Sequence, residues 1–373
     1  MQVPFIDLPA LHRPVEDEIM DALKRVLQSG RYILGPVVQE FEDAVAGDVG
    51  ASCAVGVSSG TDALLAALMA LDVGPGDKVI TTAFSFVSTG EVIVRTGAEP
   101  VLVDIEEGGF NLDIDAVADV LSRDKEKKVK AVVPVHLYGR MADMKRLKAV
   151  VGDIPVIEDS AQSLGAEREG FRAGSAGTMA CFSFFPTKNL GCLGDGGMVS
   201  TSSAELYDKL LMIRSHGGKT KSDHPIIGGN FRLDPIQAAV LSVKRPHLER
   251  WTQARRDNAA AYNEGLENLG VPVELPPMDG KEETCVWNQY VILTKERDEL
   301  RAFLAERGIG TAVYYEKPFH MEGCFSYLGH QEGDFPRAER AAAQGLALPV
   351  HPMLEKEQRE FVIEGIANFF ADK

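Results

Sequence analysis

Residues 182–197 read FSFFPTKNLGCLGDGG, a stretch in which a single lysine, Lys188, lies between an apolar run and a glycine-rich loop. Another apolar run follows at 198–200. A lysine held in a cleft away from bulk water loses its proton more easily, and the neutral amine can attack a carbonyl to form a Schiff base. The pattern therefore offers a nucleophilic amine at Lys188, with an ordinary surface lysine in a hairpin as the alternative.

On both sides of this stretch, short runs rich in Val and Ile alternate with segments of helical periodicity, a pattern typical of βαβ units in a mostly parallel sheet. The expected strands are 54–57, 78–81, 99–103, 129–135, 156–158, 179–183 and 198–200, and a helix is expected over 61–71. The carboxyl ends of parallel strands meet at one rim, where ligands of such sheets bind. Residues that directly follow the strands are therefore the candidates for a site.

A second pattern begins near Asp234. Pro235 suits a first helical turn, and helical periodicity continues to Leu269, with a bend expected near Pro246. Shorter units follow, a strand over 287–293 and a helix over 297–307. We expect a large domain over 1–245 and a smaller α+β domain over 246–373.

Two further motifs follow expected strands. SSGTD at 58–62 opens a helix, whose exposed N–H groups and dipole favour an anion, although Ser and Thr before a helix are also ordinary caps. VIEDSAQ at 156–162 places Asp159 at a strand end, where an acid caps a helix, faces water or holds a cation. Together with Lys188, these are the three contacts that pyridoxal 5′-phosphate needs: phosphate, ring nitrogen and aldehyde.

Composition narrows the function classes. With 45% hydrophobic and 25% charged residues the chain is typical of a globular protein, and 39 basic against 55 acidic residues give a net charge of −16, which disfavours nucleic acid and anionic membranes as partners. The five cysteines lack CxxC spacing, so neither a metal site nor a disulfide framework is predicted. Without a signal peptide or a long apolar run, a cytoplasmic location is expected.

The sequence resembles the DegT/StrS-type sugar aminotransferases, which are pyridoxal 5′-phosphate enzymes of fold type I, like aspartate aminotransferase. The resemblance covers nearly the whole chain, from PFIDL at 4–8 through SSGTDAL at 58–64, IEDSAQ at 157–162, residues 182–197 and GGNFRLD at 228–234 to LPVHP at 348–352. It implies an α/β fold, with a mostly parallel seven-stranded sheet in the large domain, and a homodimer with shared active sites.

The resemblance also implies roles for individual residues. Lys188 would form the Schiff base and then carry a proton, and Asp159 would pair with the pyridine nitrogen. The remaining cofactor contacts would be Phe86 stacked on the ring, Gln162 at its other side, Gly60, Thr61 and Ser183 at the phosphate, and Asn230 at the phosphate of the neighbouring subunit. The alternative for Phe86 is that it is a core residue, since Phe84 is close to it in the sequence. The alternative for Asn230 is that it is a turn residue.

In the family the acceptor is a keto sugar, usually linked to a nucleotide, glutamate or glutamine donates the amino group, and the products serve polysaccharide or antibiotic pathways. Candidate substrate contacts in matched motifs are Arg31, Tyr32, Arg232, Tyr314, Tyr315, Lys317 and His320. The alternative for Arg31, Arg232, Lys317 and His320 is that each is an ordinary surface or ion-pair residue, and the three tyrosines are candidates to line the sugar pocket.

Four other functions stay open at this stage. Some relatives act as sugar dehydratases and have histidine in place of the lysine, so Lys188 favours transamination. A cysteine desulfurase would need a reactive cysteine, for which Cys324 is the candidate. A regulatory protein could keep the pocket without turnover. A phosphate-binding oxidoreductase is disfavoured because no strand-linked GxGxxG loop is present.

Overall fold

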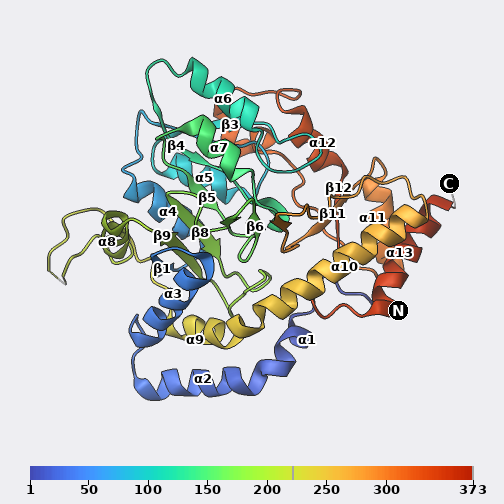
Figure 1. The fold of residues 1–373 in the computed structure, drawn as a ribbon, viewed down its shortest axis with the longest axis horizontal. Helices are drawn as coiled ribbons and strands as arrows, with labels where there is room; N and C mark the ends of the chain where they lie inside the picture. Colours follow the sequence, from blue (N-terminus) through green and yellow to red (C-terminus); the bar gives the residue numbers. More distant parts are fainter. Residues whose placement is uncertain (221, 372–373) are drawn as a thin grey trace.

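A seven-stranded sheet forms the centre of the molecule (Figure 1). The computed structural model describes residues 1–220 and 222–371. The strands of the sheet are β1 (Cys53–Val57), β2 (Lys78–Thr82), β3 (Glu99–Val103), β4 (Val129–Val133), β5 (Ile157–Asp159), β8 (Met179–Ser183) and β9 (Gly197–Thr201). Hydrogen bonding gives the orders β1-β9-β8-β5 and β3-β2-β4, and parallel bridges from Val132 to Val156 and from Val135 to Asp159 join the two sets.

Only β9 runs against its neighbours in this sheet, since the other pairs are parallel. The prediction of a mostly parallel seven-stranded sheet is therefore confirmed. The strand ends differ from the expected ones by one or two residues; the strand expected over 129–135, for example, ends at Val133.

Helices cover both faces of the sheet (Figure 1). They are α4 (Gly60–Ala70), α5 (Ser88–Arg95), α6 (Ile114–Arg123), α7 (Met144–Val151) and α8 (Ala204–Ile213). Successive side chains of a strand point to opposite faces, and in β4 Ala131 and Val133 pack in one cluster with Leu64 of α4, whereas Val132 packs in another with Val117 of α6. Burial on both faces explains why these strands are nearly continuous apolar runs.

Three further helical segments form the lower edge of Figure 1. They are α1 (Leu8–His12) with the 3₁₀ turn η1 (Arg13–Val15), α2 (Glu16–Ser29) and α3 (Pro36–Val49). Helix α2 packs along α9 (Pro235–Lys244). The 3₁₀ turn η3 (Arg245–His247), which contains Pro246, then leads into the long helix α10 (Leu248–Asn268). The expected bend at Pro246 is therefore present.

Several elements of the C-terminal part pack against α10 (Figure 1). The elements of this part are β10 (Glu283–Thr284), β11 (Tyr290–Leu293), α11 (Arg297–Glu306), η4 (Phe319–Met321), η5 (Gly323–Leu328), α12 (Pro336–Gln344), β12 (Gly345–Leu348) and α13 (Lys356–Ala371). Those that pack against α10 are β11, α11, β12 and α13. Strand β11 pairs with β12, and β10 pairs with the short hairpin β6 (Glu167–Arg168) and β7 (Phe171–Arg172). The expected strand over 287–293 begins only at Tyr290.

The domain division at 245/246 stays a prediction. One apolar cluster lies largely within the C-terminal part and includes Tyr262 and Leu348, but another joins Phe84 and Val135 to Phe319. The two parts therefore share a packed boundary. No helix in the described part of the chain is long and apolar enough to cross a membrane.

Candidate active site

Lys188 lies in a folded loop between β8 and β9. The Phe184 N–H donates to the Gly196 carbonyl at 2.8 Å, which closes the loop, and Asn189 links it to the segment before β11. The Asn189 Nδ2 donates to the Val286 carbonyl, and Asn288 Nδ2 donates to Asn189 Oδ1, both at 2.8 Å. Burial lowers the pKa of Lys188 to about 8, against the opposing effect of Asp159. The lysine is therefore desolvated, unlike a lysine at the tip of a surface hairpin.

Asp159 ends strand β5 and is buried. Its Oδ2 accepts a hydrogen bond from Thr89 Oγ1 at 2.7 Å, and its Oδ1 accepts from the Ala161 N–H at 3.2 Å. Burial raises the pKa of Asp159, and these two donors together with Lys188 oppose that shift. No helix begins directly after β5, so Asp159 is not a helix cap.

The neighbouring carboxylate, Glu158, points to the other face of β5 and has a structural role. It contacts His136 Nε2 at 2.8 Å and accepts backbone N–H groups of Gly174 and Gly177. Because His136 Nδ1 accepts from the Ala142 N–H, the ring proton lies on Nε2 and is donated to Glu158. This buried network fixes the register of the strand that carries Asp159.

Thr89 is the residue of this site that sequence reasoning missed. It lies in the first turn of α5, its hydroxyl donates directly to Asp159, and Ser85 Oγ lies 3.3 Å from that hydroxyl. Thr89 lies in the stretch AFSFVST at 83–89, in which the resemblance assigns a role only to Phe86. A hydroxyl in the first turn of the helix after a strand was the available signal.

Replacing Thr89 by valine is expected to weaken binding of pyridoxal 5′-phosphate about tenfold. The change keeps the shape of the side chain but removes a hydrogen bond to a charged group, which contributes about 1.5–3 kcal/mol. The pKa of Asp159 would rise further, so less carboxylate would be ionised. Equilibrium cofactor release, followed by absorbance, measures the effect.

Ser85→Ala is the matched control, since Ser85 contacts Thr89 but has no hydrogen bond to Asp159. It should change cofactor release much less. Equal release from wild type and the valine variant would show that Thr89 does not support Asp159.

Gly60 and Ser183 lie against each other where β1 and β8 end. A Cβ added to Gly60 would lie 2.7 Å from the Ser183 Cβ, so no larger residue fits there without a shift. Ser59 caps α4 through the Asp62 N–H at 3.0 Å, and the Ser58 and Ser59 hydroxyls both donate to the Asp62 carboxylate. The cap and the anion site coexist, leaving the hydroxyls of Ser183 and the adjacent Thr61 for an anion at the helix start.

Phe86 and Gln162 both contact Tyr315. Phe86 is 53% exposed whereas Phe84 is 0% exposed, so Phe84 is the core residue and Phe86 the one free to cover a ligand. The Tyr315 ring centroid lies 6.0 Å from that of Phe86, and its hydroxyl accepts from Gln162 Nε2 at 3.0 Å. Gln162 Oε1 also accepts the Tyr138 N–H at 2.7 Å.

A family model described as the DegT/DnrJ/EryC1/StrS aminotransferase family matches residues 14–367. This protein belongs to that family. It is 46% identical over 372 residues to a Geobacillus stearothermophilus "pleiotropic regulatory protein", covering 99% of both chains. It is 41% identical over 370 residues to a Streptomyces venezuelae dTDP-3-amino-3,4,6-trideoxy-alpha-D-glucose transaminase, covering 98% of this chain and 95% of that one.

Solved structures of the family share the fold. The crystal structure of DesV from S. venezuelae, in complex with a ketimine intermediate, superposes with a TM-score of 0.94 at 40% identity and covers 99% of this chain and 98% of that one. The fold type expected from the sequence is therefore shown.

The substrate candidates are spread over several parts of this family member. Tyr315 lies beside Phe86 and Gln162, and the Tyr314 carbonyl accepts from the Tyr138 hydroxyl. Arg232 forms a backbone bridge with Val57 at the end of β1. These three lie near the groups already described.

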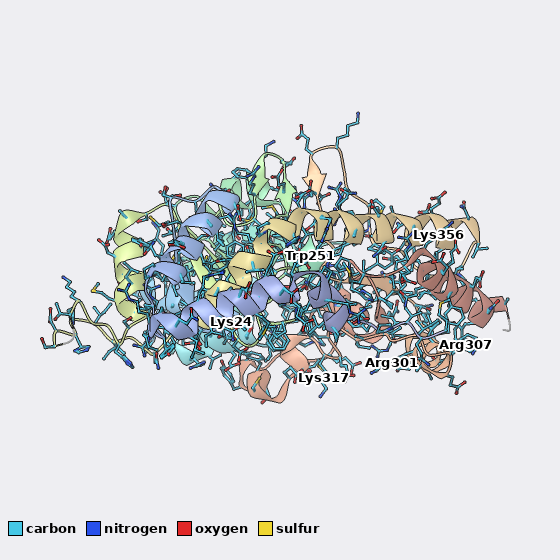
Figure 2. The ribbon with its side chains drawn as sticks, turned by 90° about the horizontal axis from the view of Figure 1, so that it is seen from below. Lys24, Trp251, Arg301, Arg307, Lys317 and Lys356 are labelled. Atoms are coloured by element: carbon cyan, nitrogen blue, oxygen red, sulfur yellow. The ribbon has the colours of Figure 1, made fainter. Side chains whose placement is uncertain are left out.

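The other candidates lie apart from this group. Arg31 is exposed between α2 and α3, and the Tyr32 hydroxyl next to it donates to the Leu27 carbonyl at 3.0 Å. Lys317 is exposed and points outward at the edge of the molecule in Figure 2. His320 is buried, with its Nε2 2.9 Å from Glu339 and its ring against Phe335. This contact is consistent with a structural role for His320.

Asn230 is exposed on the segment after α8, where it bridges Ser215 through the backbone. Its side chain forms no hydrogen bond with any described residue of its own chain. This segment extends from the left side of the molecule in Figure 1. The position suits a residue that serves a neighbouring subunit, and that role stays a prediction.

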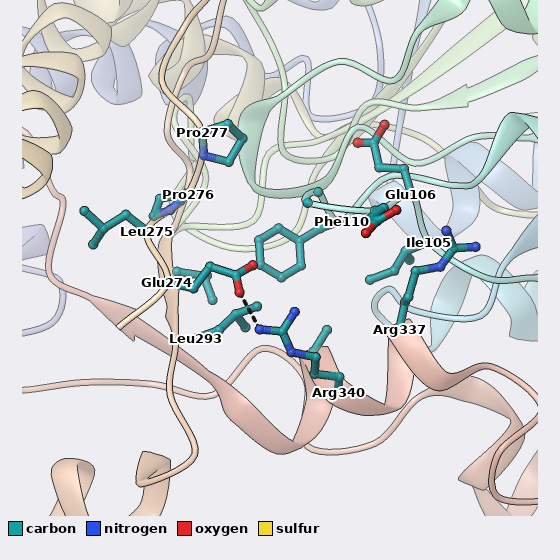
Figure 3. A pocket seen from close by; sticks show the side chains of 15 residues that line it. Ile105, Glu106, Phe110, Glu274, Leu275, Pro276, Pro277, Leu293, Arg337 and Arg340 are labelled. Atoms are coloured by element: carbon teal, nitrogen blue, oxygen red, sulfur yellow. Dashed lines mark hydrogen bonds and ion pairs between the residues drawn. The ribbon is translucent and has the colours of Figure 1, made fainter. Parts of the chain in front are cut away.

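A separate cavity of about 170 Å³ lies between residues 105–110, residues 274–277 and α12 (Figure 3). Its two arginines are already paired, Arg340 with Glu274 and Arg337 with Asp113. None of Lys188, Asp159 or Phe86 lines it. This cavity is therefore separate from the site that contains Lys188 and Asp159. The described residues contain no group of His, Cys, Asp and Glu side chains arranged to hold a metal ion.

Proposed function

We propose that this protein is a pyridoxal 5′-phosphate-dependent aminotransferase that moves an amino group from glutamate or glutamine to a nucleotide-linked keto sugar, for amino-sugar biosynthesis. The observation that carries the proposal is the half-buried amine of Lys188, whose pKa burial lowers, within electrostatic reach of the buried carboxylate of Asp159. Membership of an aminotransferase family and the 41% identity to a dTDP-sugar transaminase support the reaction class.

The residues present fit the cofactor. The carboxylate of Asp159 is buried with two neutral donors and the nearby lysine, so a protonated ring nitrogen would complete its charge balance. Gly60 and Ser183 leave a surface without side-chain bulk at the start of α4, where a phosphate is favoured. The exposed ring of Phe86 is free to stack. When bound, the cofactor supplies an aldehyde and an electron sink.

The chain's own groups would do the remaining work. Nζ of Lys188, once free, would move the proton from the donor's α-carbon to the aldehyde carbon of the cofactor, and in the second half of the reaction from that carbon to the sugar carbon that receives the amino group. Asp159 would hold the positive charge of the ring nitrogen, an electrostatic role that is strongest in a buried site. Tyr315 and Phe86 would cover the ring and exclude water, and Gln162 would hold Tyr315 in place.

Cofactor uptake by the apoprotein is expected to accelerate as the pH rises to about 8 and to level off above it. The pKa of Lys188 is lowered from 10.5 to about 8, and only the neutral amine attacks the aldehyde, so the reactive fraction is small below pH 8 and nearly complete above it. Absorbance of bound cofactor against time, at a series of pH values, measures this.

Because the negative charge of Asp159 raises the pKa of Lys188, Asp159→Asn should move the midpoint of uptake to lower pH. A rate that keeps rising towards pH 10 would contradict the desolvated position of Lys188.

We also propose that the protein is a cytoplasmic homodimer in which Asn230 completes the phosphate site of the partner. The exposed, outward position of the Asn230 segment supports this arrangement.

A regulatory protein that binds the cofactor without turnover is the second candidate, because the 46% identical relative carries a regulatory name. One experiment separates the two. The holoprotein is incubated with glutamate and a panel of nucleotide-linked 3-keto and 4-keto sugars, and 2-oxoglutarate and the mass of the sugar product are measured. Stoichiometric 2-oxoglutarate and an amino sugar support the enzyme. Bound cofactor with neither product, for glutamate and for glutamine, supports the regulator.

A further inference from the structure

A small cavity adjoins the Lys188 loop on the side of the C-terminal part. It is lined by Thr187, which precedes the lysine, and by Tyr314, Arg255, Asn288, Gln289 and His351. Its volume of about 10 Å³ has room for about one water-sized group. The cavity therefore adjoins the loop that carries Lys188, and none of the residues assigned to the cofactor lines it.

Arg255 is a buried cation without a carboxylate partner. It projects from α10, is 5% exposed, and its Nη1 donates to the Trp287 carbonyl at 3.2 Å. Its Nε has no hydrogen-bond partner, and no carboxylate of the described residues forms an ion pair with it. Burial lowers the pKa of Arg255 to about 10, so the guanidinium is still charged at neutral pH.

A buried charge normally has a partner, because desolvating it costs several kcal/mol. The other buried arginine of the described residues follows that rule. Arg214, which is buried to a similar degree, pairs with Glu42. The chain has 55 acidic residues, yet it places none of the described ones against Arg255. We read this unpaired guanidinium as a site for an anion that comes from outside the chain.

The other polar groups of the cavity are also unsatisfied. Asn288 Oδ1 and Gln289 Oε1 are buried without a partner within the described chain, and the His351 ring, beside the Pro4 carbonyl, forms no well-aligned hydrogen bond. Asn288 is held in place by its Nδ2 bond to Asn189. The cavity thus offers a cationic donor for a carboxylate oxygen, beside two acceptor oxygens that have no partner in the described chain.

We propose that Arg255 binds a carboxylate of the amino donor. This inference rests on the proposed aminotransferase function, since it assigns the donor to the space beside Lys188. A planar carboxylate can insert one oxygen where the cavity holds one water-sized group, whereas a tetrahedral phosphate of the sugar nucleotide is too bulky. Glutamate and glutamine share the α-carboxylate, so the site serves either.

The test compares Arg255→Gln with Arg256→Gln in the holoenzyme. Arg256 is the next residue of α10 and loses the same charge, but it is partly exposed and pairs with Asp279 at 3.2 Å. The probe is glutarate, a five-carbon dicarboxylate without an amino group, titrated by calorimetry. We expect the Kd of glutarate to rise at least tenfold in the Arg255 variant and to stay within about twofold in the Arg256 variant, in line with loss of a charge-assisted bond.

Steady-state kinetics give the second readout. The KM for glutamate should rise at least tenfold in Arg255→Gln, while the KM for the keto sugar stays unchanged. Unchanged glutarate binding, or a rise in the KM of the keto sugar alone, would overturn the proposal. If the glutamine variant does not fold, Arg255→Lys keeps a cation, and a crystal structure of the wild type with glutarate decides: a carboxylate on Arg255 supports the site and its absence there overturns it.

The proposed function and the donor site at Arg255 would be refuted by different results. A wild-type protein that makes no amino sugar from any keto sugar, with either glutamate or glutamine, refutes the proposed function. A wild-type protein that does so, with an Arg255 variant of normal glutamate KM, refutes this donor site and leaves the function standing.

Discussion

Lys188→Ala should lose transamination by about 10⁴-fold or more, the scale seen when a covalent nucleophile is removed. The variant lacks both the amine that binds the aldehyde and the group that moves the proton, so no other side chain of the site replaces it. Production of 2-oxoglutarate from glutamate measures the loss. Borohydride treatment, which in the wild type should fix the cofactor to residue 188, should leave the variant unlabelled.

The fold should survive this change. Lys188 is a desolvated amine with no side-chain hydrogen bond to any described residue, and the loop is closed by backbone bonds such as that of Phe184 to Gly196. The free energy of unfolding of the apoprotein should therefore change by no more than about 1 kcal/mol. Partial rescue by added methylamine would show that only the amine is missing. Turnover comparable to wild type without rescue would refute the role of Lys188.

Asp159→Asn is expected to slow proton abstraction by about 10²–10³-fold, as loss of one preorganised electrostatic contact does. The amide keeps the size of the side chain and its acceptor for Thr89, but it carries no charge to hold a proton on the ring nitrogen. The measurement is a single-turnover rate with α-deuterated glutamate, which isolates the proton transfer.

The control is Asp113→Asn, because Asp113 caps α6 and pairs with Arg337, without a hydrogen bond or ion pair to Asp159 or Lys188. It should affect stability and leave the single-turnover rate unchanged. Equal rates for wild type and Asp159→Asn would mean that the carboxylate does not act on the ring.

The sequence located Lys188 and Asp159 because each lies in a local motif at the end of an apolar strand. It could not choose between Phe84 and Phe86, since both lie in one stretch and their exposure depends on where β2 ends. The Thr89–Asp159 hydrogen bond could not be predicted from the sequence either. It joins residues 70 positions apart and depends on how α5 packs over the sheet.

Other features of the structure could not be recognised from the hydrophobic pattern of the sequence. Strands β6, β7 and β10 have two residues each, too few to show alternation. His320 lies in a matched motif, but its buried pairing with Glu339 depends on how η4 meets α12. Arg255 lies in the long helical pattern, where a charged residue is normally solvated, and only the packing of α10 against residues 287–288 reveals its burial.

The asparagine pair that fastens the lysine loop to the chain ahead of β11 has a mechanical consequence. Asn189 is hydrogen-bonded to both the Val286 carbonyl and Asn288. A hinge movement of the C-terminal part would therefore also move the loop that carries the Lys188 amine. Binding of a donor to the C-terminal part and positioning of the Lys188 amine would then occur in a single coordinated movement.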